Sequence, residues 1–246
     1  YNISIFSIID YSIGLNPINI FSNTREQFSF FGGLLMCFIV GLYDDKFNLS
    51  PIKKLFLNFF IIFVVISIDD NLVIKSLSFS FLEYPIELNN ISNFFTILCV
   101  LLFINALNMF DGINFQAATY CIIIFTLLLF KNVYSFYCFI LILSLSLFLI
   151  YNFKNKCFLG DSGTQFLSFL ISYIFIKTYN IERSIEPEEI FIILSFPGLD
   201  MFRLFLLRIF NGKHPFSPDT NHMHHLIKFR YNFFYAFLII QVMIIL

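Results

Sequence analysis

Long apolar segments constrain the fold of this chain more than any other feature. Eight of them run approximately over residues 28–43, 55–68, 91–107, 116–130, 136–151, 164–178, 190–202 and 231–246, and residues 1–9 resemble the end of another. Hydrophobic residues make up 59% of the chain and charged residues only 13%, a composition typical of integral membrane proteins. Because backbone polar groups in lipid must be satisfied within the protein, the sequence predicts an all-α integral membrane protein, a polytopic helix bundle with about eight to nine crossings.

Four polar clusters interrupt the apolar segments, and all four fall on the same side when the crossings alternate in direction. They lie within residues 44–54, 108–115, 152–163 and 203–230. That side carries ten of the fifteen Lys and Arg residues, so the positive-inside bias makes it cytoplasmic. The active site is therefore expected in a cytoplasmic cleft. On the other side, residues 69–90 predict a loop or short hairpin whose acids, Asp69 and Asp70, are solvated.

Charge and cysteine usage argue against three other classes of protein. The net charge is −1 and no basic run contains interleaved aromatic residues, so no nucleic acid partner is expected. The five cysteines stand singly without CxxC spacing, which argues against both a disulfide framework and a zinc ribbon.

Four aspartates in three of the clusters offer hard oxygen ligands. These are Asp44, Asp45, Asp111 and Asp161. Carboxylates that converge at one membrane face suit a magnesium ion with a phosphate-bearing substrate. Because Mg²⁺ usually takes only one or two carboxylates, at least one acid is left for proton transfer or for holding an acceptor. The alternative for any single acid is a helix cap or a lysine partner.

Two asparagines precede Asp111 at helical spacing. Asn105, Asn108 and Asp111 follow one another at intervals of three, which places their side chains along one side of a helix end. Substrate binding is one interpretation of this row, and hydrogen bonding between helices is the other.

Glycines flank the acid of the third cluster. Gly160 and Gly163 around Asp161 indicate a tight turn that opens a helix, whose free backbone N–H groups can face an anion.

All four histidines lie in the last cluster, in a stretch of twelve residues, at positions 214, 222, 224 and 225. A zinc site is one interpretation, although no cysteine or fourth ligand stands at a suitable spacing. Imidazoles together with the nearby Arg203 are better suited to binding a diphosphate and neutralising a leaving phosphate.

The four clusters together resemble the polyprenyl-phosphate N-acetylhexosamine-1-phosphate transferases, the family 4 glycosyltransferases related to phospho-N-acetylmuramoyl-pentapeptide transferase. The motifs occur in the family's order: GxxDD from Gly41, NAxNxxDG from Asn105, FLGDSG from Phe158 and PFSPDxxHxHH from Pro215. The last motif is similar to the branch that uses UDP-N-acetylglucosamine or a related UDP-N-acetylhexosamine. The chain departs from the family pattern at Asn114-Phe115, where Asp-Gly is usual.

The resemblance implies a membrane enzyme that acts at the bilayer surface. Its substrates would be a UDP-N-acetylhexosamine, UDP-GlcNAc above all, and undecaprenyl phosphate as the polyprenyl acceptor. The enzyme would transfer the sugar-1-phosphate to this lipid and release UMP, the initiating step of a cell-envelope glycan. It implies Mg²⁺, or alternatively Mn²⁺, as cofactor and the bacterial inner (cytoplasmic) membrane as location, and it leaves a homodimer open as the assembly.

By motif position, the resemblance also implies roles for individual residues. Asp161 would be the principal metal ligand with Asp111 nearby, whereas Asp44 and Asp45 would receive the lipid phosphate, one of them acting as base. Direct attack is favoured over a phospho-aspartyl intermediate. The expected substrate-binding residues are Asn105, Asn108, Lys53, Arg203, His222, His224 and His225.

Residues 1–246 are expected to form a single transmembrane transferase domain that lacks the family's amino-terminal crossings. Two alternatives stay open. A transporter or channel would need polar groups near the middle of the crossings, which are nearly free of them, and a truncated homologue would keep the acids without activity.

Overall fold

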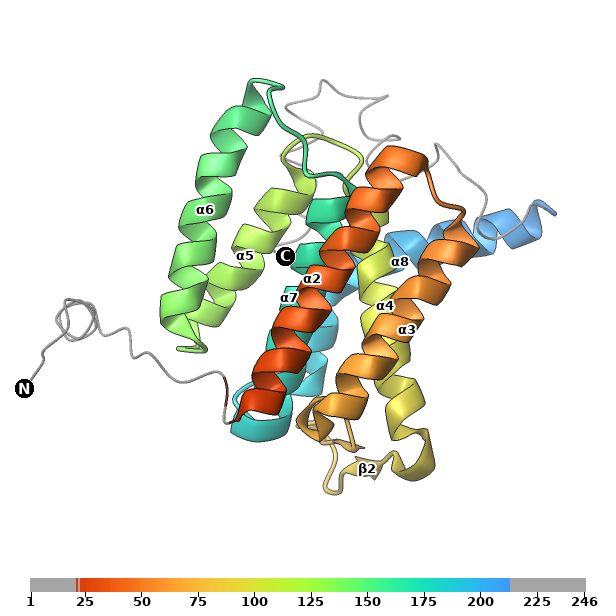
Figure 1. Cartoon of the computed structure of the whole chain (residues 1–246). Coiled ribbons are helices and arrows are strands. Elements are labelled where there is room, and N and C mark those ends of the chain that lie inside the picture. Colours follow the sequence, from red (N-terminus) through yellow and green to blue (C-terminus); the bar gives the residue numbers. More distant parts are fainter. Residues whose placement is uncertain (1–20, 22, 213–246) are drawn as a thin grey trace, which may run out of the picture.

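The computed structural model describes residue 21 and residues 23–212, in which seven α-helices alternate in direction (Figure 1). Their bounds are α2 (Thr24–Phe47), α3 (Pro51–Ile68), α4 (Ser92–Phe110), α5 (Gln116–Phe130), α6 (Ser135–Phe153), α7 (Gly160–Lys177) and α8 (Pro187–Phe210). Each of the first seven predicted crossings coincides with one of these helices. The eighth, over residues 231–246, and the partial one at residues 1–9 lie outside the described residues.

Local sequence signals account for several helix boundaries. Asn23 caps α2 by accepting a hydrogen bond from the backbone N–H of Glu26 at 2.9 Å. The helix ends at Asn48, which has the left-handed conformation that asparagine tolerates (φ 50°). Pro51 and Pro187 stand in the first turns of α3 and α8, where the missing N–H costs nothing.

Within the described residues, five helices are long and apolar enough to cross a membrane. They are α2, α3, α4 with the turn before it, α6 and α8. Helix α5 is also apolar but has only 15 residues. The mostly helical, multi-pass membrane fold is thus confirmed, whereas the predicted count of eight to nine crossings stays a prediction.

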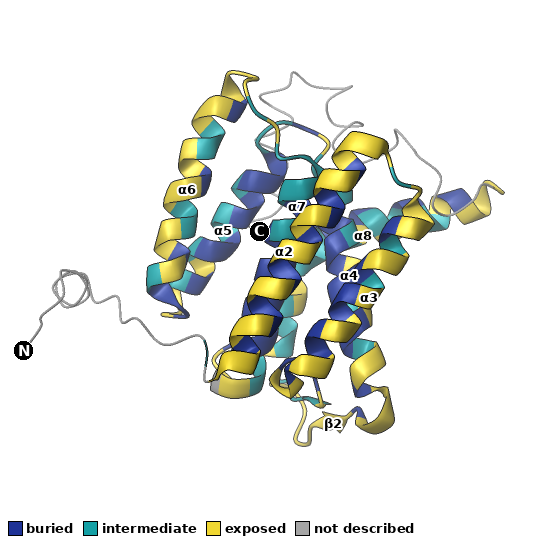
Figure 2. Cartoon of the chain, in the orientation of Figure 1, coloured by how far each residue is buried: buried dark blue, intermediate teal, exposed yellow. Residues whose placement is uncertain are grey.

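Helix α7 lies at the centre of the bundle. Between Thr164 and Thr178 all its residues except Phe166 are buried, and it packs against both α2 and α4. The outer helices α2, α3 and α6 alternate between buried and exposed positions (Figure 2), and many of their exposed side chains are apolar. The apolar exterior of the outer helices suits a bilayer, and the buried helix α7 is shielded from lipid.

The hairpin predicted within residues 69–90 is confirmed. The segment contains two short 3₁₀ turns, η1 (Asp70–Leu72) and η2 (Asn89–Ile91), and two antiparallel strands, β1 (Ser76–Leu77) and β2 (Ile86–Glu87). The hairpin lies at the end of the bundle opposite to the α2–α3 turn (Figure 1). We call this end the hairpin end.

The prediction that Asp69 is solvated is wrong. Its exposed fraction is 3%, whereas Asp70 is exposed as expected. The cause is Lys177 at the end of the central helix, whose Nζ lies 2.6 Å from Oε2 of Glu26 and 3.9 Å from Oδ2 of Asp69. A buried ammonium requires anionic partners, so both acids are drawn inside. Burial raises the pKa of Asp69, and the charge of Lys177 opposes that rise.

Candidate active site

Two of the four predicted acids share one lysine at the opposite end of the bundle. The Nζ of Lys54 in α3 lies 2.7 Å from Oδ2 of Asp44 in α2 and 2.9 Å from Oδ2 of Asp161 in α7. The side chains of Lys54 and Asp44 are 8% and 7% exposed, so this ammonium is held largely away from water. A single cation thus joins acids that are far apart in the sequence.

Asp45 holds the beginning of α7. Its Oδ1 accepts a hydrogen bond from the backbone N–H of Asp161 at 2.8 Å, and its Oδ2 accepts one from Ser162 at 3.0 Å. Gly160 has φ 65°, the left-handed region that favours glycine. The predicted turn that opens a helix is therefore confirmed, and the anion that its N–H groups face is Asp45. We call Asp44, Asp45, Lys54 and Asp161 the acid–lysine cluster.

A close approach of α2 and α7 makes this geometry possible. A Cβ atom added to Gly41 would lie 2.5 Å from the carbonyl oxygen of Asp161 and 2.6 Å from the nitrogen of Ser162. Only glycine lets the two backbones come so close. Because Asp44 and Asp45 follow Gly41 by one helical turn, the contact sets them beside the first turn of α7.

Asp111 ends α4 and adds negative charge near the cluster. Burial, together with the charges of Asp161 and Asp45, raises its pKa to about 7. Burial likewise raises the pKa of Asp161 to about 6, although Lys54 opposes that rise. Lys54 is a single cation beside Asp44 and Asp161, with Asp45 and Asp111 nearby, and this excess of carboxylates favours binding of a further cation.

The two asparagines of the second cluster differ in their contacts. Asn108 accepts a hydrogen bond from Oγ1 of Thr164 at 2.9 Å, so α4 and α7 are joined there as the structural alternative predicted. Asn105 donates to the carbonyl oxygen of Leu101 in its own helix at 2.8 Å. Substrate binding by either asparagine stays a prediction.

The loop after Asp111 is tied to the segment that leads into α7. Asn114 donates to Oδ1 of Asn155 at 2.6 Å, and the N–H of Phe115 donates to Oδ1 of Asn152 at 2.9 Å. Phe115 has φ 74°, a conformation that suits the glycine usual in the family at this position. Its ring lies 5.4 Å from that of Phe153, which is a packing contact that glycine would lack.

Sequence reasoning selected Lys53 and missed Lys54 as the lysine of the cluster. Lys53 is exposed, whereas Lys54 is buried. The helical period does not separate the two lysines, because Lys53 is followed one turn later by the apolar Leu57, which is exposed, and Lys54 by the polar Asn58, which is buried. Substrate binding by Lys53 stays a prediction.

The remaining predicted residues fall in or after α8. Arg203 pairs with Asp200 of the same helix, with 2.8 Å between its guanidinium and Oδ1. Helix α8 extends beyond the bundle at its carboxyl end (Figure 1). His222, His224 and His225 lie outside the described residues.

The arrangement of the acids bears on the expected metal ion. Within residues 21 and 23–212, no group of three or more His, Cys, Asp or Glu side chains is arranged to hold a metal. Mg²⁺ nevertheless needs only one or two carboxylates when water and phosphate oxygens complete its shell. Burial and, after it, neighbouring carboxylates raise the pKa values of Asp111 and Asp161, and a divalent cation bound beside them would compensate the charge gathered there.

Comparison with known proteins gives a consistent result. The sequence profile of glycosyl transferase family 4 matches residues 27–179, a segment that contains the whole acid–lysine cluster and Asp111. The chain is 28% identical to the undecaprenyl-phosphate alpha-N-acetylglucosaminyl 1-phosphate transferase of Salmonella typhi, covering 92% of this chain and 63% of that protein. The protein of that name from Escherichia coli (strain K12) is 28% identical, covering 76% and 54%. A probable undecaprenyl-phosphate N-acetylglucosaminyl 1-phosphate transferase of Bacillus subtilis (strain 168) is 29% identical, covering 86% and 61%. The chain therefore spans less than two thirds of the length of these relatives.

Proposed function

The chain belongs to glycosyl transferase family 4, and we propose that it transfers N-acetylhexosamine-1-phosphate from a UDP-sugar to a membrane polyprenyl phosphate. The relatives are named for N-acetylglucosaminyl 1-phosphate and undecaprenyl phosphate, which makes UDP-GlcNAc the first donor to test. One observation carries the proposal: Lys54 joins Asp44 and Asp161 at one end of an apolar helix bundle. A charged site at that position suits a lipid phosphate that meets a soluble nucleotide.

The proposed reaction is a phosphoryl transfer. An oxygen of the lipid phosphate attacks the β-phosphorus of the UDP-sugar, the bond from that phosphorus to the UMP oxygen breaks, and UMP leaves. The sugar then remains on a lipid diphosphate. Such a reaction depends mainly on positioning the two phosphates and on neutralising their charge.

In the proposal, the residues of the acid–lysine cluster have different roles in positioning the phosphates and neutralising their charge. Lys54 provides the positive charge that allows a lipid phosphate to approach Asp44 and Asp45. Asp45 accepts two backbone N–H groups, and Asp44 accepts one from Leu49 and pairs with Lys54, so either acid remains a candidate for the base. Direct attack remains favoured over a phospho-aspartyl intermediate.

Asp111 and Asp161 would hold the divalent cation. When bound, Mg²⁺ would neutralise the diphosphate of the donor. The donor's diphosphate and sugar would be bound by the predicted substrate-binding residues, which are Asn105, Asn108, Lys53, Arg203, His222, His224 and His225. The site would face the cytoplasm of a bacterial inner membrane, where soluble UDP-sugars are present, and a homodimer is the proposed assembly.

A transfer assay tests the proposal. Membranes containing the chain are supplied with undecaprenyl phosphate, Mg²⁺ and one UDP-N-acetylhexosamine at a time, and both UMP and lipid-linked sugar are measured. We expect both products in equal amounts with UDP-GlcNAc and neither after chelation of Mg²⁺. Asp161→Asn is the control for enzymes native to the membranes. Folded protein that forms no product with any donor would contradict the proposal.

A further inference from the structure

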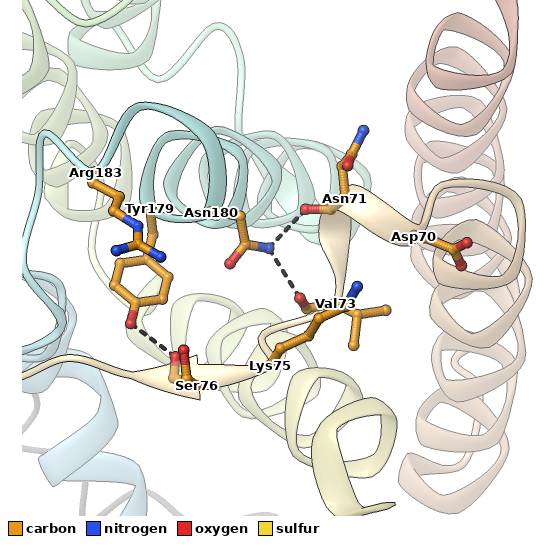
Figure 3. A pocket seen from close by; sticks show the side chains of 8 residues that line it. All are labelled: Asp70, Asn71, Val73, Lys75, Ser76, Tyr179, Asn180 and Arg183. Atoms are coloured by element: carbon orange, nitrogen blue, oxygen red, sulfur yellow. Dashed lines mark hydrogen bonds between the residues drawn. The ribbon is translucent and has the colours of Figure 1, made fainter. Parts of the chain in front are cut away.

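Two cavities meet at the hairpin end, where Tyr179 lines both of them, and the second extends from there along α4 and α8. The first has a volume of about 190 Å³ and lies between the β1 segment and the π-helical turn η3 (Thr178–Glu182) (Figure 3). The second has a volume of about 490 Å³ and lies between α4, α7 and α8. The first is lined mainly by polar residues and the second mainly by apolar ones.

The walls of the polar cavity are fixed by hydrogen bonds. Nδ2 of Asn180 donates to the carbonyl oxygens of Asn71 at 2.6 Å and Val73 at 3.1 Å (Figure 3). The hydroxyl of Tyr179 donates to the carbonyl oxygen of Ser76 at 2.8 Å. These bonds join η3 to the segment before the hairpin, so the cavity is preformed.

Two cations line the polar cavity without an ion-pair partner in the described part of the chain. They are Lys75, beside β1, and Arg183, which directly follows η3. Arg183 has φ 49°, a left-handed conformation that is uncommon for arginine. The acid among the lining residues, Asp70, lies on the far side of Asn71 from Arg183 (Figure 3). Two cations against one acid favour an anion, and arginine with lysine is a common phosphate-binding combination.

The apolar cavity has the size of a ligand site, and the residues that the structure describes leave it open. Its volume falls within the range of roughly 300–1,000 Å³ typical of small-molecule sites. Cys99 in α4, Phe175 in α7 and Leu194 in α8 are among its walls. A Cβ atom added to Gly198, which also lines it, would meet nothing within 4 Å. In a bilayer, a hydrocarbon chain is the natural occupant of such a space.

We propose that the two cavities together bind one anionic phospholipid, with its phosphate between Lys75 and Arg183 and an acyl chain between α4 and α8. Residues 74–77 border both cavities. Lys75 and Ser76 line the polar cavity, whereas Ile74 and Leu77 line the apolar cavity. A free phosphate would use only the first cavity and a neutral lipid mainly the second. The polar cavity lies at the other end of the bundle from the proposed transfer reaction, and the apolar cavity extends from there as far as Ala106 in α4 and Phe202 in α8.

Thermal unfolding of the purified full chain tests the occupant. The chain is mixed with dioleoylphosphatidylglycerol, with dioleoylphosphatidylcholine, or with glycerol 3-phosphate as a head group without chains. We expect the anionic lipid to raise the melting temperature by roughly 2–4 °C more than the neutral lipid, and glycerol 3-phosphate to have no effect. Equal shifts with the two lipids would overturn the phosphate contact, and a full shift with glycerol 3-phosphate would overturn the acyl chain contact.

Matched variants test each half of the site. Lys75→Gln with Arg183→Gln should abolish the preference for the anionic lipid, whereas Arg25→Gln, which removes an exposed cation at the same end of the bundle, should retain it.

Gly198→Phe should fill the apolar cavity and reduce the shift caused by either lipid. Gly32→Phe is its control, because a Cβ at Gly32 also meets nothing within 4 Å but lies outside both cavities. The melting temperature of each variant without lipid shows that it is folded. If the double variant at Lys75 and Arg183 responds to lipid like the unmodified chain, the phosphate contact is overturned. If the Gly198→Phe variant does so, the acyl chain contact is overturned.

Discussion

Oδ1 of Asp45 accepts a hydrogen bond from the backbone N–H of Asp161 at 2.8 Å, so a side chain of α2 caps helix α7. Helix caps usually come from the residue that precedes the helix. Here Leu159 precedes α7 and offers no side-chain cap. The first turn of α7, which carries a candidate metal ligand, therefore depends on a different helix for its position.

Asp45→Asn should weaken this cap. An amide has one oxygen, so it can accept only one of the two N–H groups, and its own NH₂ faces the other. We expect the free energy of unfolding to fall by about 0.5–2 kcal/mol, with a loss of transferase activity, as measured by denaturant titration and the UMP assay. Asp70→Asn, at an exposed aspartate outside the cluster, should change stability by less than about 0.5 kcal/mol. Equal effects of both substitutions would contradict the capping role.

Gly41→Ala should push α2 and α7 apart. The added methyl group would collide with the backbone of Asp161 and Ser162, which cannot move without displacing α7. We expect a loss of about 1–3 kcal/mol in stability, as for other overpacked contacts, together with a lower rate of transfer. Gly32→Ala lies on the same helix where a Cβ has free space, so it should stabilise by about 0.5–1 kcal/mol. A stable, fully active Gly41→Ala protein would disprove the close contact.

Lys54→Gln and Lys53→Gln form a matched pair of adjacent substitutions. Removal of the Lys54 charge leaves Asp44 and Asp161 facing each other without a shared cation. We expect the transfer rate to fall by about 10²–10³-fold. Lys53 is exposed, and its substitution should raise the Michaelis constant for the UDP-sugar if the predicted donor contact exists. A variant at Lys54 with an unchanged rate would remove this lysine from the proposed mechanism.

Lys177→Met should destabilise the hairpin end. It leaves Glu26 and Asp69 buried without their cation, which typically costs about 3–5 kcal/mol. Lys131→Met breaks the half-exposed pair with Glu189 and should cost less than about 1 kcal/mol. Adding Glu26→Leu to Lys177→Met should restore part of the loss, as measured by thermal unfolding. If the two single variants lose equal stability, the buried pair is not important.

The sequence predicted those features that depend on position along the chain. Alternation of the crossings was enough to bring Asp44, Asp45, Asp111 and Asp161 to one end of the bundle, because a helix that spans a bilayer fixes which end each loop reaches. The same counting placed the hairpin at the other end.

Features that depend on packing between distant segments were not predictable in this way. Lys53 and Lys54 are neighbours in sequence, and only the partners on α2 and α7 show which of them is buried. Asp69 and Asp70 are indistinguishable in sequence for the same reason. The burial of Asp69 depends on Lys177, which the chain reaches only after four more helices.

The pairing of Glu26 with Lys177 also bears on how the protein is made. Glu26 lies in the first turn of α2, and its carboxylate pairs with Lys177, the last residue of α7. During synthesis, α2 is complete long before α7 emerges, and an unpaired carboxylate is costly away from water. Glu26 must therefore stay hydrated at the membrane surface until α7 docks, so this end of the bundle closes late in assembly.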